Sequence, residues 1–370
     1  MRNIFTYKND KQLKFLSYLV YFMIILILLI MLSTACSMNH QKEQPEQSNH
    51  KITDSITPIE QTGFYFDTVC TIGIYDMENF NEENALAEIE HIFNLCEEYD
   101  LLFSMTNINS DVYRINHAEG KTVKVDPLTV ELIKKGIIYG DLSDGMFDIT
   151  IGGVSTLWDF HNVENPKLPD DEILKDALPH IDYKNINIIN ETEVQLKDPK
   201  AKIDLGGIAK GYIADLIYKK LKKDEVISAM INLGGNLACI GKKPGQDYFT
   251  AGIRLPFSDK EEIIGTTLLN DETLVTSGIY ERYFKIDDVL YHHILNPETG
   301  YPFATDVLSV TIKSKAEQSA DCDALSTICL SLGVQKGKKL IESLDGYEAA
   351  FIDLNNQIIL TSGMELNAIE

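Results

Sequence analysis

The sequence is poor in basic residues for its size. Its 370 residues include 33 Lys and Arg against 56 Asp and Glu, which gives a formal net charge of −23. Because such a chain repels phosphate groups overall, we exclude a general nucleic-acid-binding protein. A phosphate-bearing ligand would have to be held locally, by backbone amides, a few basic side chains or a metal ion.

The chain also lacks a cysteine pattern and a repeat. Its six cysteines include no CxxC pair and no zinc-like spacing. Disulfide frameworks belong to short secreted chains, so we expect the cysteines of the body to be buried free thiols. No repeat of about 20 to 50 residues is visible, which argues against a solenoid or a propeller.

The first 35 residues have the layout of an export signal. A basic start precedes the apolar run FLSYLVYFMIILILLIML, and the small residues Ser33, Thr34 and Ala35 come directly before Cys36. This arrangement resembles a bacterial lipobox, although Ser33 stands where Leu is usual. We expect residues 1–35 to be a lipoprotein signal peptide and Cys36 to carry the lipid, palmitate included. The alternative is an uncleaved transmembrane anchor, since the apolar run is nearly long enough to span.

Both alternatives place the rest of the chain on the extracytoplasmic face of the cell membrane. Residues 36–61 are polar, and we expect a flexible tether that begins with the lipidated Cys36. The globular domain would then cover residues 62–370. Loss of the leader removes four basic residues and one acid, which lowers the net charge from −23 to −26.

The body mixes helical and strand patterns. Helices are predicted for residues 81–104, 126–145, 209–225 and 321–344, from the spacing of apolar residues and from Asp126-Pro127 as a start signal. Short alternating segments predict strands at 68–76 and through much of 228–315, and a strand pair closes the chain. The order lacks regular βαβ alternation, so the expected class is α+β with antiparallel sheets and packed helices.

Two glycine-rich stretches precede and follow the third helix. DLGGIAKGY (residues 204–212) opens that helix, and helix N-termini offer free N–H groups to anions. It matches neither GxGxxG nor GxxxxGK[ST], so a tight strand-to-helix turn explains it equally well. INLGGN (residues 231–236) is explained by a β-bulge or by close strand packing.

Three further segments carry polar groups or a lone aromatic residue. In SADCDALSTICLSLG (residues 319–333), Asp323 and Thr327 share one helix face with Ser326 beside them, which is a hard-oxygen set suited to Mg²⁺ or simply part of a capped helix. In YHHIL the adjacent histidines point to opposite faces of a strand, so at most one of them faces a given site. Trp158 is the only tryptophan, and it fits either the core or a flavin contact.

Taken together and in this order, these motifs resemble the ApbE family, the FAD:protein FMN transferases. The resemblance rests on GFYFDTVCTIGIY, LFSMTNINSDVYRIN, GMFDITIGGVSTLWDF, IDLGGIAKGY, INLGGN, TSGIYERYF, HHILNPETGYP and DALST, and it covers the chain from about Gly63 onward. It implies an ApbE-type, T-fold-like core and an exported, usually lipid-anchored enzyme. It also implies Mg²⁺-dependent cleavage of FAD, with FMN moving to a Ser or Thr hydroxyl of a target flavoprotein and AMP leaving.

The resemblance further implies roles for individual residues. Asp323 and Thr327, with Ser326 and the backbone carbonyl of Gly207, would bind the metal, and His293 matches a histidine thought to help activate the acceptor hydroxyl. The implied FAD contacts are Phe66, Thr106, Trp158, Asp159, Phe160, Asp204, Lys210 and Leu295. The sequence departs from the family at Phe66-Asp67, where a Met-Gly pair is common, and at Thr106, where an aromatic residue or Asn often stands.

Two other functions use the same residues. A Mg²⁺-dependent FAD pyrophosphatase would use water as acceptor and give FMN and AMP. A membrane-tethered flavin-binding lipoprotein without chemistry would use only the glycines and aromatic residues, and it would have no need for the DALST set.

Overall fold

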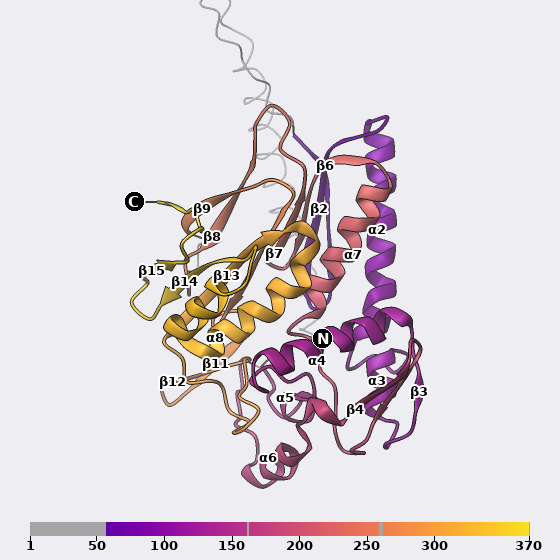
Figure 1. The fold of residues 1–370 in the computed structure, drawn as a ribbon, viewed down its shortest axis with the longest axis vertical. Coiled ribbons are helices and arrows are strands. Elements are labelled where there is room, and N and C mark those ends of the chain that lie inside the picture. Colours follow the sequence, from indigo (N-terminus) through magenta and orange to yellow (C-terminus); the bar gives the residue numbers. More distant parts are fainter. Residues whose placement is uncertain (1–56, 161–162, 259–261, 370) are drawn as a thin grey trace, which may run out of the picture. The chain divides into compact units, whose positions relative to one another are not determined.

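A computed structural model describes residues 57–160, 163–258 and 262–369. Within these ranges an eight-stranded antiparallel sheet forms the centre, and helices pack against it (Figure 1). Its strand order is β1-β2-β6-β7-β10-β13-β14-β15. The strands are β1 (Ile59–Tyr65), β2 (Thr68–Met77), β6 (Val226–Leu233), β7 (Asn236–Ile240), β10 (Glu272–Gly278), β13 (Val307–Lys315), β14 (Glu348–Asp353) and β15 (Ile358–Leu360). The expected α+β class with antiparallel sheets is confirmed.

Two hairpins of this sheet turn through residues with positive φ. Phe66 and Asp67 join β1 to β2 with φ of 54° and 56°, and Gly234 and Gly235 join β6 to β7 with φ of 61° and 97°. Two-residue hairpin loops favour this left-handed conformation because it matches the strand twist. A Cβ on Gly234 would lie 2.1 Å from Oγ1 of Thr68. The LGG stretch is therefore a hairpin turn in a closely packed place, where the sequence had suggested a bulge or close packing.

Three smaller sheets complete the described strands. β16 (Asn367–Ala368), β9 (Ile263–Leu269) and β8 (Phe249–Arg254) form one, and β11 (Tyr283–Ile286) and β12 (Val289–His292) form a hairpin. The third contains β3 (Val123–Lys124), β5 (Glu193–Leu196) and β4 (Ile186–Asn190). The segment 265–278, which reads as continuous strand pattern, is thus divided between β9 and β10 in two different sheets.

The four predicted helices are present as α2, α4, α7 and α8, with α8 beginning two residues earlier than predicted, and the short helices α3, α5 and α6 were not predicted. Asn81 caps α2 by accepting the Asn84 N–H at 2.9 Å, and Asp126 caps α4 by accepting the Leu128 N–H at 2.8 Å. The helices are α2 (Glu82–Phe103), α3 (Asp111–Asn116), α4 (Pro127–Leu142), α5 (Gly152–Ser155), α6 (Asp171–Ala177), α7 (Ala209–Lys223) and α8 (Ser319–Glu342), with 3₁₀ turns at Leu178–His180, Tyr183–Asn185 and Ala316–Gln318. α8 is kinked at Gly333, where φ is 77°.

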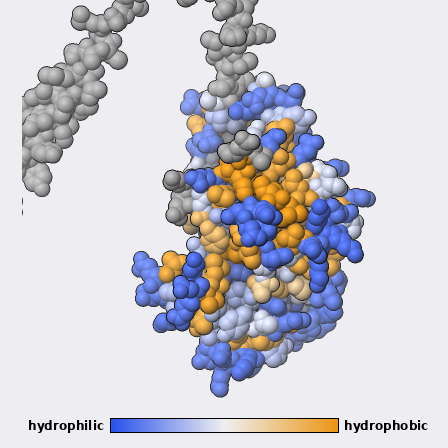
Figure 2. Space-filling model, turned by 90° about the vertical axis from the view of Figure 1, so that its left-hand side faces the viewer, coloured by the Kyte–Doolittle hydropathy of each residue, from blue (hydrophilic) through white to orange (hydrophobic). Residues whose placement is uncertain are grey.

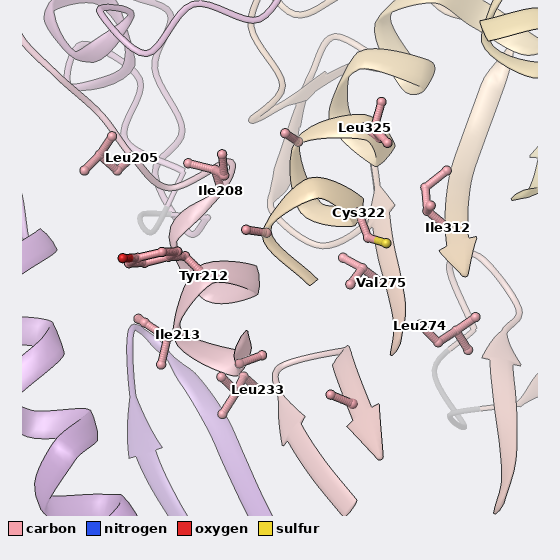
Figure 3. Packing of buried hydrophobic residues seen from close by; sticks show 14 of the residues in the cluster. Leu205, Ile208, Tyr212, Ile213, Leu233, Leu274, Val275, Ile312, Cys322 and Leu325 are labelled. Carbon is pink, nitrogen blue, oxygen red and sulfur yellow. The ribbon is translucent and has the colours of Figure 1, made fainter. Parts of the chain in front are cut away.

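Helices α7 and α8 pack against each other and against strands of the large sheet. Figure 3 shows Tyr212 and Ile213 of α7 and Cys322 of α8 among the core side chains, with Val275 of β10 close to Cys322. These four residues are at most 1% exposed. Each of the five cysteines in the described ranges is buried and free, as expected from their spacing. The core therefore fixes the two helices that carry the predicted site residues.

One face of the described surface carries an apolar area. Figure 2 shows apolar residues gathered on one face and bordered by hydrophilic ones, an arrangement typical of surfaces that contact another molecule. Among the described residues no helix is both long and apolar enough to cross a bilayer. The predicted signal peptide, Cys36 and nearly all of the tether lie outside the described residues.

Candidate active site

The stretch Asp204–Gly207 forms a tight turn that leads into α7. The two carboxylate oxygens of Asp204 shape this turn: Oδ1 accepts the Gly206 N–H at 2.9 Å, and Oδ2 accepts the Ser155 hydroxyl at 2.7 Å. A Cβ on Gly207 would lie 3.9 Å from Oγ1 of Thr327. Gly207 therefore lies beside the Thr327 hydroxyl, although the two residues are far apart in the sequence.

Asp323 lies on α8 and reaches the start of α7. Asp323 is 3% exposed, and its Oδ2 accepts the Gly211 N–H at 2.9 Å. Lys210 Nζ lies 4.0 Å from Oδ1 of the same carboxylate. One oxygen is thus bound to the backbone of α7, while the other lies on the side of the Lys210 ammonium group.

A hydroxyl group from β10 joins the two hydroxyls of α8. Ser277 Oγ lies 2.7 Å from Ser326 Oγ and 3.4 Å from Thr327 Oγ1. Ser326 also donates to its own helix at the Asp323 carbonyl, at 2.9 Å, and is fully buried. The Ser326 hydroxyl is therefore already engaged, whereas Thr327 is the partly exposed hydroxyl of the pair.

These groups fit the ligand preferences of Mg²⁺. The donors brought together are one carboxylate, hydroxyl groups and the backbone at Gly207, all of them hard oxygen ligands. No cluster of three His, Cys, Asp or Glu side chains suited to a metal occurs among the described residues. A set with a single carboxylate suits Mg²⁺ because this ion keeps waters and phosphate oxygens in its shell.

The two histidines have different surroundings, and only His292 lies in a strand, since β12 ends there and His293 lies in the bend that follows. His292 is 4% exposed and its Nε2 lies 3.1 Å from the Phe303 carbonyl, while its Nδ1 accepts the Ile294 N–H at 3.3 Å. Burial lowers the pKa of His292 to about 4. Both ring nitrogens are used inside the protein, so His292 has a structural role.

His293 is partly exposed, and its Nδ1 lies 3.2 Å from the Arg282 carbonyl. A carbonyl only accepts, so Nδ1 carries the proton and Nε2 keeps a free lone pair. Burial, and then the Arg282 charge, lower the pKa of His293 to about 3. His293 is therefore neutral at physiological pH, with Nε2 able to accept a proton.

Glu281 adds a second acid near Lys210 and Asp323. Glu281 is an exposed residue, although many protein atoms lie around its carboxyl group. Burial raises the pKa of Glu281 to about 7; the Lys210 charge opposes this shift and the Asp323 charge adds to it. Segments 204–211, 277–282 and 323–327 thus contribute charged and hydroxyl groups to one region.

The residues predicted to contact FAD differ in how accessible they are. Thr106 and Asp159 are exposed, and Phe66, Phe160, Asp204 and Lys210 are partly exposed. Trp158 and Leu295 are 4% and 7% exposed and belong to a small separate apolar cluster. Trp158 donates from Nε1 to the Gly300 carbonyl at 2.8 Å and stacks on Phe160 with a centroid distance of 5.5 Å. The Trp158 ring is therefore buried in this small cluster, where it packs against Phe160.

The ApbE family model matches residues 66–351, which is most of the chain. The chain belongs to the ApbE family. A relative from Klebsiella pneumoniae, called FAD:protein FMN transferase, is 35% identical over 292 residues, which cover 78% of this chain and 88% of the relative. A relative of the same description from Treponema pallidum is 32% identical over 312 residues, 80% of this chain and 85% of its own.

Solved structures of ApbE proteins share the fold. The ApbE protein of Thermotoga maritima matches with a TM-score of 0.74 at 32% identity, covering 82% of this chain and 96% of its own. The flavinyl transferase ApbE of Pseudomonas stutzeri matches with a TM-score of 0.71 at 25% identity, covering 82% and 94%. The mixed helix and antiparallel-sheet architecture of this chain is therefore that of the ApbE proteins.

Three residues of this ApbE chain belong to the site but were not predicted as site residues from the sequence. Ser277 bonds to the DALST hydroxyls, Arg282 orients His293 through its carbonyl, and Glu281 stands between them in the chain. All three belong to TSGIYERYF, so the motif marked the segment without showing which side chains face Asp323.

Proposed function

We propose that this chain transfers FMN from FAD to a Ser or Thr hydroxyl of a target flavoprotein, with release of AMP and with a requirement for Mg²⁺. Membership of the ApbE family supports the flavin-transfer activity, because relatives that match most of the chain are described as FAD:protein FMN transferases. The observation that carries the proposal is the convergence of Asp323, Thr327 and Lys210 at the start of α7.

Asp323 Oδ1, the Thr327 hydroxyl and the Gly207 carbonyl would hold the metal ion. A bound Mg²⁺ supplies neutralisation of pyrophosphate charge and alignment of the phosphate oxygens. Lys210 adds a positive charge on the same side of Asp323. In a chain with a net charge of −23, these local cations offset the general repulsion of phosphate.

The reaction itself would transfer the FMN phosphoryl group to the acceptor hydroxyl and the hydroxyl proton to a base. The acceptor oxygen bonds to the phosphorus of the FMN half, and the bond from that phosphorus to the bridging oxygen breaks, so that AMP leaves with the bridging oxygen. The hydroxyl proton passes to Nε2 of His293, which its Nδ1 contact to Arg282 keeps unprotonated. Positioning and charge neutralisation contribute most of the catalysis in such transfers, so a weak base in the right place is enough. Nearby pyrophosphate charge would also raise the pKa of His293 from its ligand-free value of about 3.

We further propose that the enzyme is a lipoprotein, anchored through Cys36 on the extracytoplasmic face of the cell membrane. The basic start, apolar run and small residues before Cys36 support this. The polar stretch 37–61 would let the catalytic domain reach an acceptor protein near the membrane.

The decisive experiment is incubation of the domain with FAD, Mg²⁺ and a flavoprotein domain that offers a Ser or Thr acceptor, followed by intact-mass analysis. A mass gain equal to covalent FMN, lost when EDTA is added or when the acceptor hydroxyl is removed, is the expected result. Free FMN and AMP without acceptor modification would instead establish a pyrophosphatase. Unchanged FAD would leave a flavin-binding lipoprotein.

A further inference from the structure

Helices α7 and α8 cap each other with carboxylates. Gln318 and Ile208, the N-cap residues of α8 and α7, make no side-chain capping bond within the described part of the chain. Asp215 of α7 instead accepts the Ser319 N–H at 2.7 Å and the Ala320 N–H at 3.1 Å. These are the first two residues of α8, whose N–H groups have no partner inside their own helix.

The reverse bond runs from α8 to α7. Asp323 Oδ2 accepts the N–H of Gly211, the third residue of α7, at 2.9 Å. Each helix start is therefore satisfied by an acid of the other helix. Negative charge at a helix start is favourable because the helix dipole is positive there.

The two helices touch through their backbones at this place. A Cβ on Gly211 would lie 2.2 Å from the Ser319 carbonyl oxygen and 2.8 Å from Cα of Ala320. A real side chain would have to push these backbone atoms away, so glycine is needed for the close approach. The capping bonds of Asp215 and Asp323, and the absence of a side chain at Gly211, together set the position of α8 along α7.

This arrangement also fixes the orientation of the Asp323 carboxylate. With Oδ2 bound to Gly211, Oδ1 is the oxygen on the Lys210 side, 4.0 Å from Nζ. A shift of α8 relative to α7 would move Oδ1 and Thr327 together, since both lie on α8 within about one helical turn. The Gly207 carbonyl would stay with α7.

We infer that Asp215 is a positioning residue for the proposed metal site. It is 3% exposed and follows Lys210 and Gly211 along α7. It holds the start of α8 so that Asp323 and Thr327 face Gly207. The inference rests on the proposed function for the metal site at Asp323 and for the identity of the metal. It concerns residues that act on the site through the helix pair rather than by touching the substrate.

The test compares Asp215→Asn and Gly211→Ala with a matched control, Asp111→Asn. Asp111 is also buried, at 4% exposed, and it also accepts a backbone N–H, that of Asp126 at 2.7 Å. This bond, however, joins α3 to the start of α4. Binding of Mn²⁺, as a stand-in for Mg²⁺, is measured by electron paramagnetic resonance with FAD present and acceptor absent. Thermal unfolding is measured without metal.

Both α7 variants should weaken Mn²⁺ binding about 10- to 100-fold, which is the usual effect of losing a group that orients a metal ligand. Asp111→Asn should lower the melting temperature without changing Mn²⁺ affinity. The Mg²⁺ concentration for half-maximal activity should rise in the α7 variants, while binding of FAD in EDTA stays as in the wild type. Gly211→Ala keeps every charge, so a metal defect in it points to helix position.

The inference is overturned if both α7 variants lose stability but bind Mn²⁺ as the wild type does. Asp323→Ala serves as the reference for loss of the ligand itself. If Asp323→Ala also binds Mn²⁺ normally, the metal assignment falls and the positioning role falls with it. If only Asp323→Ala loses Mn²⁺, the metal assignment stands and Asp215 is a structural cap. Should Asp215→Asn not fold, Gly211→Ala alone decides between these outcomes.

Discussion

Asp323 accepts the backbone N–H of Gly211 at 2.9 Å, so the acid of the DALST motif is held by the helix that the DLGGIAKGY motif begins. Two motifs separated by more than a hundred residues thus share one hydrogen bond. The bond explains why the glycine-rich stretch is ambiguous when read alone. Its partner is supplied by a distant segment, through the packing of α7 on α8.

Asp323→Ala should abolish Mg²⁺-dependent FMN transfer. Loss of an electrostatic group at a reacting centre typically costs about 10²–10³-fold in kcat, and the proposed metal site has a single carboxylate. The Gly211 N–H would be left unpaired, at a cost of about 1–3 kcal/mol of unfolding free energy, which a domain of ordinary stability tolerates. Transfer rate and circular dichroism are measured together.

The control on the same helix is Asp321→Asn. Asp321 bonds to Lys135 Nζ at 2.8 Å and to the Tyr347 hydroxyl at 3.3 Å, so it belongs to a different contact. Its replacement should leave the transfer rate unchanged. Full transfer activity in a folded Asp323→Ala protein would sink the metal assignment.

Thr327→Val and Ser326→Ala should differ, although the two residues are neighbours. Val keeps the shape of Thr but removes the hydroxyl beside Gly207, so the Mg²⁺ requirement should rise about 10-fold or more. Ser326 is already bonded to Ser277 and to the Asp323 carbonyl, so its loss should mainly cost about 1 kcal/mol of stability. Activity is titrated against Mg²⁺ for both variants; a larger metal defect in Ser326→Ala would make Ser326 the ligand and contradict this ranking.

His293→Gln should lower kcat for transfer and leave the affinity for FAD nearly unchanged. Removal of a general base typically costs about 10²–10⁴-fold in rate. Gln can still donate towards the Arg282 carbonyl, so the loop should keep its place. Single-turnover transfer is compared with FAD binding in EDTA, and an unaltered turnover rate would exclude His293 as the proton acceptor.

Cys36→Ser should abolish attachment of lipid to the protein. The serine cannot form the thioether and thioester links of a lipoprotein, so labelling by a palmitate analogue should also be lost. The purified domain should still act on a soluble acceptor, because the described fold, from β1 (Ile59–Tyr65) onward, contains the whole proposed site. A wild-type protein that carries no lipid and keeps residues 1–35 would instead favour an uncleaved transmembrane anchor. Mass analysis of the purified wild type and variant shows whether lipid is attached and whether residues 1–35 are retained.

Local signals in the sequence predict the helix starts well. Asp126 caps α4, the helix whose start the Asp126-Pro127 pair predicts, because a capping bond involves only residues two or three positions apart. The antiparallel, α+β character also follows from alternating segments without βαβ order. The spatial order β7-β10-β13 does not follow, since it depends on pairings between strands far apart in the chain.

The site is predictable only in part, for the same reason. The motifs DALST and DLGGIAKGY predict Asp323, Thr327 and Lys210 as site residues. The contact of Ser277 with Ser326, in contrast, depends on the position of β10 beside α8. From the sequence the Trp158 ring could be placed in the core or at the flavin, and the structure buries it with a bond to the Gly300 carbonyl. Contacts made across sheets and helices leave no mark in the local pattern.

The low pKa of His292 makes stability depend on pH. Burial lowers it to about 4, whereas an unfolded chain has an ordinary histidine pKa of about 6.5. The unfolded state therefore binds a proton first as the pH falls. The stability contributed by neutral His292 is complete above about pH 6.5 and is lost as the pH falls from there towards about 4. Between about pH 7.5 and about pH 5 this group alone should cost about 2 kcal/mol.

Urea unfolding of the wild type and of His292→Gln at these two pH values measures that contribution. The variant should be less stable at the higher pH, because the bonds to Phe303 and Ile294 are weakened. Its loss of stability on acidification should nevertheless be smaller than that of the wild type, by about 2 kcal/mol. Groups distant from His292 titrate in both proteins and cancel in the comparison, whereas His293 shifts slightly because the His292 charge contributes to its low pKa. Equal pH dependence in the two proteins would mean that His292 is not held neutral by its surroundings.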